Sequence, residues 1–474
     1  MRLLRALIST GFCATLCAQP VTEKYRDTAA RLIGAALESD AGMNRLEYLC
    51  DRIGNRLSGS SSLEKAIDWA SAEMTRAGLE NVRKLPVKVP HWVRGQESAT
   101  LLNPLERPLF MLGLGDSVGT PAGGITADVV AVSDFEELAA LGKDKVAGKI
   151  VVFNAPYVSY GQTVAYRAAG PSRAAALGAV AVLVRSITPF SLRSPHTGAL
   201  QYDPNVNKIP AAAVSIEDAE SLARLVKSGA SVRVRLNMEA KMLPDADSFD
   251  VIGEIPGSEK PEEIVVLGGH IDSWDIGQGA QDDGSGIMAA LEAVSLIKKA
   301  GLRPSRTIRV AFWTNEENGG AGGRAYAKWA GDPAQTHVAA IEMDGGAEKP
   351  VGFGFGSGGG GRRSRRPMVP GDVETPPTTE AAFARAVEIG KLLDGIEAGS
   401  MQRGGGGSDI GPLMAAGVPG FGMATVGTHY FDWHHTNADT FDKVNPHDFK
   451  LNVAALAVLS YVLADMPERL SGMK

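Results

Sequence analysis

Acidic residues and histidines gather in five short clusters, most of them directly after an apolar run. The clusters are VVLGGHIDSWD, GAQDDGSG, VAFWTNEENG, VAAIEMDGG and FDWHHTNADTFD, and four of the five lie between Val265 and Gly346. They supply imidazole nitrogens and carboxylate oxygens without a single thiol, which suits zinc or a similar divalent ion. The clusters therefore predict a site for two metal ions of the kind that hydrolases use.

Several of the apolar runs have the composition of buried strands, and each of these ends in one of the clusters. IVVLGG precedes His270, TIRVAFWTN precedes Glu316 and Glu317, and HVAAIEM precedes Asp344. Open α/β sheets bind their ligands at the carboxyl ends of their strands. We therefore expect these side chains to meet at one edge of a sheet.

The first two clusters each offer a group for a metal and a neighbour that supports it. Asp272 lies two residues after His270, where its carboxylate could hold the imidazole in one tautomer. Asp282 and Asp283 precede a Gly-Ser-Gly turn and a helical stretch, with Ser285 as the predicted N-cap. Taken alone, the histidine also fits a hydrogen-bonded loop residue, and the acid pair also fits a helix cap.

Two further pairs complete the candidate ligand set. Adjacent side chains diverge at a strand end, so one of Glu316 and Glu317 can bind metal while the other faces the substrate as a general base. His434 and His435 offer imidazoles near the end of the chain, and Asp439 follows a turn later as a candidate orienter. Each motif is weak by itself, and the prediction depends on finding all of them in this order.

Composition narrows the class of protein. The chain has 474 residues, of which 44% are hydrophobic and 22% charged, as in ordinary globular proteins. This length corresponds to two or three domains at about 150 residues each. The net charge of −6 argues against a nucleic-acid binder, whose basic surface would dominate.

Residues 1–18 have the pattern of a secretory signal peptide. Two arginines precede an apolar stretch from Ala6 to Ala18, which is too short to remain as a membrane anchor. Cleavage after Ala18 would leave Cys50 as the only cysteine, so no intrachain disulfide is expected. The pattern predicts a secreted or periplasmic protein without a stable membrane anchor.

The character of the sequence changes twice along the chain. Residues 21–85 have apolar positions at helical spacing, whereas residues 99–242 alternate short β-rich runs with helices and contain none of the clusters. We predict an inserted domain at 106–245, between an N-terminal helical part of the main domain at 19–105 and the rest of that domain at 246–474.

The stretch from Gly352 to Pro367, GFGFGSGGGGRRSRRP, is low in complexity and basic. It contains a GxGxxG-like match, but no following helix supports a nucleotide-binding loop. We predict a solvated, mobile loop there, with room for a lid over the site.

The series His-x-Asp, Asp-Asp-x-Ser-Gly, Asn-Glu-Glu, Met-Asp-Gly and His-His-Thr-x-x-Asp-Thr resembles the di-zinc exopeptidase family, which contains secreted bacterial aminopeptidases, glutamate carboxypeptidase and carboxypeptidase Q. The carboxypeptidase Q branch looks nearest in the order and spacing of DRIGNRLSGSSSLEKAIDWA, GGHIDSWDIGQGAQDDGSG, AAGVPGFGM and HHTNADTFDKVNPHDF. The resemblance covers nearly the whole mature chain. It implies an α/β fold, with a mixed-sheet catalytic domain that has helices on both faces and an inserted protease-associated α/β domain.

The resemblance also implies a ligand set. Asp282 would bridge two zinc ions per chain. His270 and Asp344 would complete one site, and Glu317 and His435 would complete the other. Each site would then have three protein ligands and one open position, as catalytic zinc requires.

Three further roles come from the same resemblance. Glu316 would be the general base, and Asp272 would support the site. His434 occupies the position where several relatives have a tyrosine that helps to stabilise the oxyanion, so it is a third candidate catalytic residue. The peptide bond between Asp282 and Asp283 would be cis.

The implied activity is removal of a terminal residue from dipeptides or short peptides, by an enzyme that forms a homodimer. The alternatives are an aminopeptidase with the same dinuclear site, a catalytically silent binding protein on the same fold, and a glutaminyl cyclase with one zinc ion. No residue of the sequence by itself identifies which peptide terminus is recognised.

Overall fold

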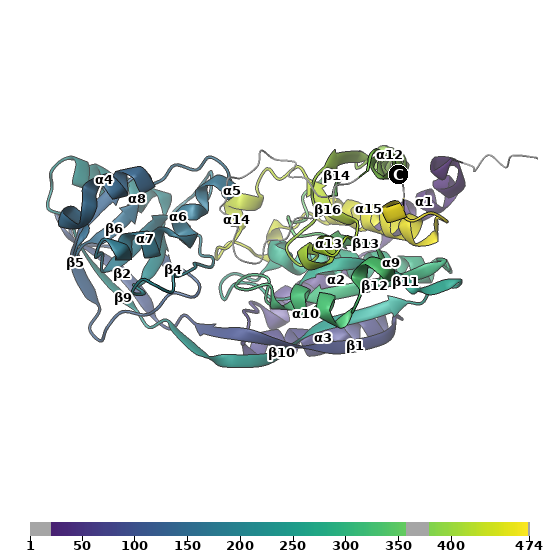
Figure 1. Cartoon of the computed structure of the whole chain (residues 1–474), viewed down its shortest axis with the longest axis horizontal. Helices are drawn as coiled ribbons and strands as arrows, with labels where there is room; N and C mark the ends of the chain where they lie inside the picture. Colours follow the sequence, from purple (N-terminus) through teal and green to yellow (C-terminus); the bar gives the residue numbers. More distant parts are fainter. Residues whose placement is uncertain (1–19, 357–378, 473–474) are drawn as a thin grey trace, which may run out of the picture.

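The computed structural model describes residues 20–356 and 379–472, which form two eight-stranded mixed sheets. We call them the main sheet and the inserted sheet. In Figure 1 the inserted sheet lies at the left and the main sheet at the right. Two long antiparallel strands, β1 (Glu80–Val93) and β10 (Lys241–Ile255), run along the bottom of this view and lead from one unit to the other. The predicted α/β class, with an inserted α/β unit, is confirmed.

The main sheet places the ends of three parallel strands side by side. β11 pairs in parallel with β12 on one side and with β13 on the other. In order across the sheet, the strands are β1, β10, β12 (Arg306–Trp313), β11 (Lys260–His270), β13 (His337–Glu342), β16 (Gly420–Thr425), β14 (Pro350–Phe355) and β15 (Ser400–Arg403).

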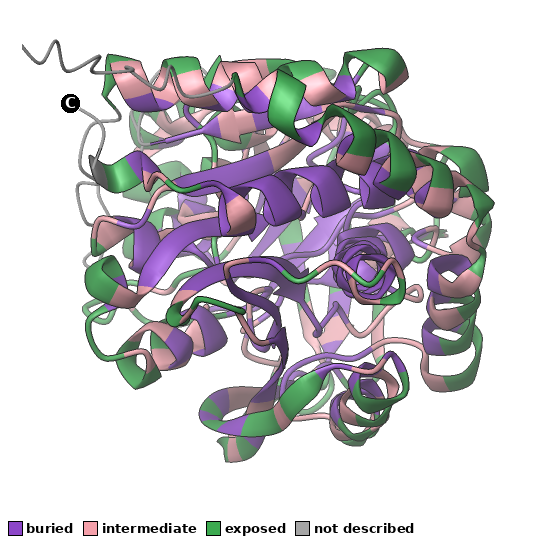
Figure 2. Ribbon diagram, turned by 90° about the vertical axis from the view of Figure 1, so that its right-hand side faces the viewer, coloured by how far each residue is buried: buried purple, intermediate pink, exposed green. Residues whose placement is uncertain are grey.

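Helices cover both faces of the main sheet because its central strands are apolar on both faces. Val265 and Leu267 of β11 belong to one hydrophobic core, and Ile264 and Val266 belong to another. The first core packs against α1 (Val21–Glu38), α2 (Ala41–Tyr48), α3 (Ser61–Arg76), α9 (Ser285–Lys299), α12 (Glu380–Gly390) and α15 (Pro446–Asp465). The second packs against α10 (Ala321–Trp329) and α13 (Gly411–Ala415). Figure 2 shows buried strands and helices at the centre and exposed faces on the outer helices.

The N-terminal helices agree with the helical spacing of the sequence, but the helical region ends earlier than predicted. A strand, β1, begins at Glu80 instead of helix continuing to residue 85. From Leu85 to Val89 every second residue is buried, which is the period of a strand with one covered face. This strand forms the edge of the main sheet.

The helix predicted after the second cluster is α9, and its cap differs from the prediction. Ser285 is the first helical residue and makes no cap. Instead, the Asp283 carboxylate accepts a hydrogen bond of 3.1 Å from the Gly286 N–H, where a negative charge also suits the helix dipole. The predicted stop is confirmed, since the helix ends at Lys299 and Gly301 has a φ of 69°.

The inserted sheet is a second α/β unit with apolar strands and its own two-sided core. Its strands, in order, are β3 (Arg107–Leu109), β2 (Glu97–Asn103), β9 (Arg233–Met238), β5 (Ile125–Val132), β6 (Ile150–Phe153), β7 (Ala181–Arg185), β8 (Ala211–Val214) and β4 (Met111–Gly113). Its helices are α4 (Phe135–Val146), α5 (Tyr160–Thr163), α6 (Ala165–Ala168), α7 (Gly170–Ala176) and α8 (Ile216–Lys227). The proposed domain limits at 106 and 245 stay a prediction.

Two predictions concern segments at the limits of the described residues. The solvated loop predicted from Gly352 is wrong for its first residues, because Gly352 to Phe355 belong to β14 and pair with β16 and β15. The rest of that loop, from residue 357, and the signal peptide at 1–18 lie outside the described residues. Within the described part of the chain, one helix, α15, is long and apolar enough to cross a membrane, and 83% of its apolar window is buried inside the protein.

Candidate metal centre

The carboxylate of Asp282 lies between two groups of candidate ligands. Its Oδ1 is 3.3 Å from His270 Nε2, and that nitrogen is 3.4 Å from Asp344 Oδ1. Its Oδ2 is 3.3 Å from His435 Nε2, and that nitrogen is 3.0 Å from Glu317 Oε2. One carboxylate therefore faces two separate pairs of donors, one with each oxygen. All five predicted ligands meet at this point.

Parallel strand ends bring three of these residues together. His270 is the last residue of β11 and lies level with Trp313, the last residue of β12. Glu317 and Asp344 come a few residues after the ends of β12 and β13. Since these strands are parallel neighbours, their carboxyl ends meet at one edge, as the sequence predicted.

Asp439 holds the loop that presents Asp282. Its Oδ1 accepts hydrogen bonds from the N–H groups of Ala280, at 3.1 Å, and Gln281, at 2.7 Å. Its Oδ2 accepts one of 3.2 Å from the Asp282 N–H. Asp439 was predicted as an orienter of the histidine pair, whereas its carboxylate orients the backbone of Asp282. The peptide bond after Asp282 is cis, as the resemblance implied.

Asp272 supports the site through a different contact from the one predicted. Its backbone carbonyl, not its carboxylate, lies 3.0 Å from His270 Nδ1, and the nearer carboxylate oxygen is 3.8 Å away. The carboxylate accepts hydrogen bonds from the N–H groups of Glu316, at 3.1 Å, and Glu317, at 3.4 Å. Asp272 thus fixes both the imidazole and the glutamate pair, because its main chain and side chain face different neighbours.

The two adjacent glutamates have different surroundings. Glu317 is buried and contacts His435, whereas Glu316 is half-buried. Burial, together with the charges of Asp282 and Glu316, raises the pKa of Asp344 to about 6, although His270 opposes the shift. Glu316 therefore lies close enough to influence the charge of Asp344, whereas Glu317 faces His435.

His434 packs against His435, the residue that follows it. Its ring stacks on His435 with centroids 3.5 Å apart, and its Nε2 lies 3.6 Å from Asp282 Oδ2. The centroid of the Tyr160 ring lies 5.0 Å from that of His434, in an edge-to-face contact. Burial and the neighbouring His435 hold the pKa of His434 well below its usual value, so its imidazole is neutral. With Asp282 and His435 it forms a second group of donors at metal-binding spacing.

The electrostatics of the cluster fit a divalent cation. Burial and the charge of Asp282 raise the pKa of Glu317 to about 8. Burial alone would also raise the pKa of Asp282, but contacts with His270 and His435 outweigh it and hold that pKa well below its usual value. Asp282 Oδ2 is buried and accepts no hydrogen bond from the described residues. Three acids and two imidazoles with lone pairs directed inward are a donor set that matches zinc.

Arg56 is a supporting residue that the sequence interpretation did not identify. It is fully buried, and it donates hydrogen bonds to the carbonyl oxygens of Ile271, at 2.8 Å, and Gly279, at 3.0 Å. It also donates to the carbonyls of Gly54 and Gln278. Arg56 thereby ties the start and the end of the loop between the first two clusters. Arg56 lies in the segment DRIGNRLSGS, which resembles the family, but the residue type alone does not indicate this role.

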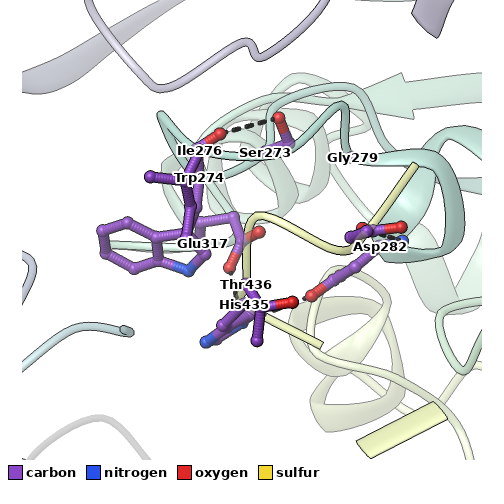
Figure 3. A pocket seen from close by; sticks show the side chains of 9 residues that line it. Ser273, Trp274, Ile276, Gly279, Asp282, Glu317, His435 and Thr436 are labelled. Carbon is purple, nitrogen blue, oxygen red and sulfur yellow. Dashed lines mark hydrogen bonds and ion pairs between the residues drawn. The ribbon is translucent and has the colours of Figure 1, made fainter. Parts of the chain in front are cut away.

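A small pocket opens beside the Glu317 and His435 side of the cluster (Figure 3). Its volume is about 170 Å³, including solvent at its mouth. The Trp274 ring lies at its wall, with its centroid 5.6 Å from that of His435. The pocket is lined by Ser273, Trp274, Ile276, Gly279, Asp282, Glu317, His435, Thr436 and Asp439. The pocket therefore adjoins the candidate ligands Glu317 and His435.

Comparison with known proteins identifies the family. Residues 250–460 match Peptidase family M28, and residues 120–222 match the PA domain. The chain is 42% identical over 451 residues to Carboxypeptidase Q of Xenopus laevis, which covers 94% of this chain and 91% of the relative.

Two solved structures have the same fold. A Peptidase M28 precursor from Shewanella amazonensis SB2B is 33% identical, has a TM-score of 0.87, and covers 95% of this chain and 99% of its own. A zinc aminopeptidase from Bacillus subtilis is 18% identical, has a TM-score of 0.65, covers 91% and 97%, and shows the fold alone. The likeness to Carboxypeptidase Q over most of both chains favours neither the aminopeptidase alternative nor a silent binding protein. The chain belongs to peptidase family M28, as a metallo-exopeptidase with a PA domain.

Proposed function

We propose that this chain binds two zinc ions and removes a terminal residue from dipeptides or short peptides, as a carboxypeptidase. The observation that carries the proposal is the Asp282 carboxylate, whose two oxygens face two separate pairs of donors. His270 and Asp344 would hold one ion, and Glu317 and His435 the other, with Asp282 bridging them. The predicted homodimer and the predicted export from the cytoplasm remain part of the proposal.

The protein's own groups supply binding and proton transfer. When bound, zinc would supply Lewis acidity, which polarises a carbonyl and activates water. Glu316 would accept a proton from the attacking water and deliver it to the leaving amine, because its carboxylate is not engaged with His435 as that of Glu317 is. Asp272 would keep Glu316 in place through the backbone hydrogen bond. His434, which is neutral, would offer an N–H to the oxygen of the scissile carbonyl.

Arg167 favours recognition of a free carboxylate. It lies on α6, is 7% exposed, and donates hydrogen bonds to the Thr197 carbonyl, at 3.1 Å, and to Tyr160 Oη, at 2.8 Å. Tyr160 in turn contacts His434. A buried cation is costly without a charge partner. Of the four other buried arginines among the described residues, Arg56 binds only carbonyl oxygens, and three have a carboxylate partner: Arg94 with Asp275, Arg306 with Glu263, and Arg309 with Glu254.

Arg167 has no carboxylate partner among the described residues. Its positive charge also helps to lower the pKa of His434, although burial and His435 contribute more to that shift. A peptide whose C-terminal carboxylate approaches Arg167 would supply the missing negative charge. An aminopeptidase would instead need a negative group near the substrate amine. This is why we favour a carboxypeptidase.

The test is a panel of matched dipeptides assayed with zinc: free, N-blocked and C-amidated. We expect cleavage of the free and the N-blocked peptides, and a large rise in KM on amidation. Arg167→Gln should abolish the preference for a free carboxylate, measured as the ratio of kcat/KM for free and amidated substrates. Cleavage that requires a free amine and ignores amidation would overturn the assignment. Elemental analysis of the reconstituted protein should give two zinc ions per chain, and one or none would overturn the dinuclear site.

A further inference from the structure

The two halves of the proposed metal centre are supported by different parts of the molecule. His270 is supported within the main domain, because its backbone N–H donates to Asp283 Oδ2, at 3.1 Å, and its Nδ1 lies 3.0 Å from the Asp272 carbonyl. Asp344 follows β13 of the same sheet. The other half, Glu317 and His435, is contacted from outside the main domain.

His435 makes two contacts with the backbone of Thr197, which lies between β7 and β8 of the inserted sheet. The Thr197 N–H donates to the His435 carbonyl at 3.0 Å, and His435 Nδ1 lies 3.3 Å from the Thr197 carbonyl oxygen. In the tautomer whose Nε2 lone pair is free for an ion, Nδ1 carries the proton and donates it to Thr197. The inserted domain therefore determines which nitrogen of His435 faces Asp282 and Glu317.

Thr197 is itself held in place from within the inserted domain. Its Oγ1 donates a hydrogen bond of 2.6 Å to the Gly113 carbonyl, and Arg167 donates one of 3.1 Å to the Thr197 carbonyl. Gly198 has a φ of 132°, and a Cβ atom there would collide with the Arg167 guanidinium. Thr197, whose carbonyl receives His435, is thus fixed by Gly113 and Arg167, neither of which belongs to the main sheet.

The loop that carries Glu317 has a matching contact. Asn318, the next residue, donates from Nδ2 to Asp116 Oδ1 at 3.3 Å. Its Oδ1 accepts a hydrogen bond of 2.7 Å from Asn315 Nδ2, on the other side of the glutamate pair. Asp116 follows β4 of the inserted sheet and is partly buried, with a left-handed φ of 64°. Both ligands of this half are therefore linked to the inserted domain, through Thr197 and Asp116.

We infer that the PA domain is a positioning element for one of the two proposed metal sites: Thr197 and Asp116 orient His435 and the Glu317 loop, while the His270 and Asp344 site is formed without them. This inference rests on the proposed dinuclear function. Thr197 and Asp116 are positioning residues, since they act through the ligands. Loss of such outer contacts typically lowers metal affinity about 10–100-fold.

The test compares matched variants of the full mature chain. Asp116→Ala removes the acceptor for Asn318, whereas Asp116→Asn keeps an acceptor oxygen and tolerates the left-handed backbone. Thr197→Val removes the hydroxyl that anchors the loop to Gly113, whereas Thr197→Ser keeps it. Zinc binding is followed by calorimetry, zinc per chain by elemental analysis, and site occupancy by the absorption spectrum of the cobalt-substituted protein.

We expect Asp116→Ala and Thr197→Val to weaken one of two zinc ions about 10–100-fold and to leave the other unchanged. Asp116→Asn and Thr197→Ser should retain both, and thermal unfolding of the metal-free proteins checks that all four variants are folded. Equal weakening of both ions, or of neither, in the Ala and Val variants would overturn the inference. Should Asp116→Ala not fold, the Thr197 pair decides alone. Failure of the wild-type protein to bind two ions would instead overturn the proposed function.

Discussion

The main sheet and the inserted sheet have the same number of strands and a similar mixture of parallel and antiparallel pairs. They differ in the residues that come after their parallel strands. In the main sheet, β11, β12 and β13 lead into His270, the glutamate pair and Asp344. In the inserted sheet, β6, β7 and β8 lead into Asn154, Ser186 and Ser215.

These three polar residues of the inserted sheet make local hydrogen bonds. Ser215 caps α8 by accepting from the Asp218 N–H at 3.2 Å, and Ser186 donates to the Val214 carbonyl at 2.7 Å. Asn154 accepts from Arg185 at 3.3 Å. By contrast, Asp282 Oδ2 at the edge of the main sheet has no hydrogen-bond partner among the described residues. The same sheet architecture can therefore form a reactive site or a purely structural unit, and the residues at its strand ends decide which.

The largest expected effect comes from removing the shared carboxylate. Asp282→Ala deletes the one group that faces both pairs of donors, so we expect loss of both zinc ions and no measurable turnover. Zinc per chain and kcat measured on the same preparation check this, and circular dichroism checks the fold. A variant that still holds two ions would show that Asp282 is not the bridge.

The next effect separates proton transfer from metal binding. Glu316→Gln should keep both ions and lower kcat by about 10²–10⁴, as expected for the loss of a general base. Steady-state kinetics and zinc analysis measure the two properties independently. Loss of zinc in this variant would mean that Glu316, not Glu317, is the ligand.

A smaller and partly reversible effect is expected at the adjacent residue. Glu317→Gln replaces a charged ligand that contacts His435 with a neutral amide, so one ion should bind more weakly. Excess zinc should then restore part of the lost activity, in contrast to Glu316→Gln. A zinc titration of kcat for both variants decides this, and a flat response for Glu317→Gln would contradict its assignment as a ligand.

The main elements of the site could be predicted from side-chain types, which a sequence displays. Buried strands that end in acids or histidines predicted where His270, Glu317 and Asp344 meet, and the 3.6-residue period predicted α1. Side-chain direction was harder to predict. The Asp272 carboxylate contacts two backbone N–H groups rather than the imidazole, and the cap of α9 comes from Asp283.

Contacts made by main-chain atoms were not predictable. Thr197 reaches His435 through its N–H and carbonyl groups, which every residue except proline has, so no residue type signals the contact. Arg56 donates from its side chain, but its acceptors are main-chain carbonyl oxygens, which are equally invisible in a sequence. The sequence therefore predicted an inserted domain without chemistry of its own, but not its contact with a candidate ligand.

The next prediction concerns how the free energy of unfolding depends on pH, through a buried acid that is not one of the candidate ligands. Asp250 lies on β10, where burial raises its pKa to about 8 from 3.8. Between these values the folded state keeps a proton that the unfolded state releases, so stability falls as pH rises, by up to about 1.4 kcal/mol per pH unit. Asp250→Asn removes this dependence, and the variant should gain stability relative to wild type from pH 4 to 8. Urea unfolding of the metal-free proteins across this window measures the difference, and a constant difference would contradict the raised pKa.

The smallest effects are expected in the inserted domain, away from the Thr197 and Asp116 contacts. Asp203 is exposed, and among the described residues its carboxylate accepts hydrogen bonds only from Asn205, two residues on, so Asp203→Ala should leave kcat and zinc content unchanged. His196 is 3% exposed, neither ring nitrogen has a hydrogen-bond partner among the described residues, and burial lowers its pKa to about 3. Its imidazole is thus neutral and acts by packing near His434 and His435.

His196→Ala should accordingly change KM or assembly at most, through a small cavity next to the site. Kinetics and sedimentation of the two variants, with wild type as reference, measure both properties. Complete loss of kcat in a folded His196→Ala protein that still binds two zinc ions would mean that the inserted domain supplies a group to the reaction itself. The contrast between the two sheets would then no longer hold, because both would carry chemistry.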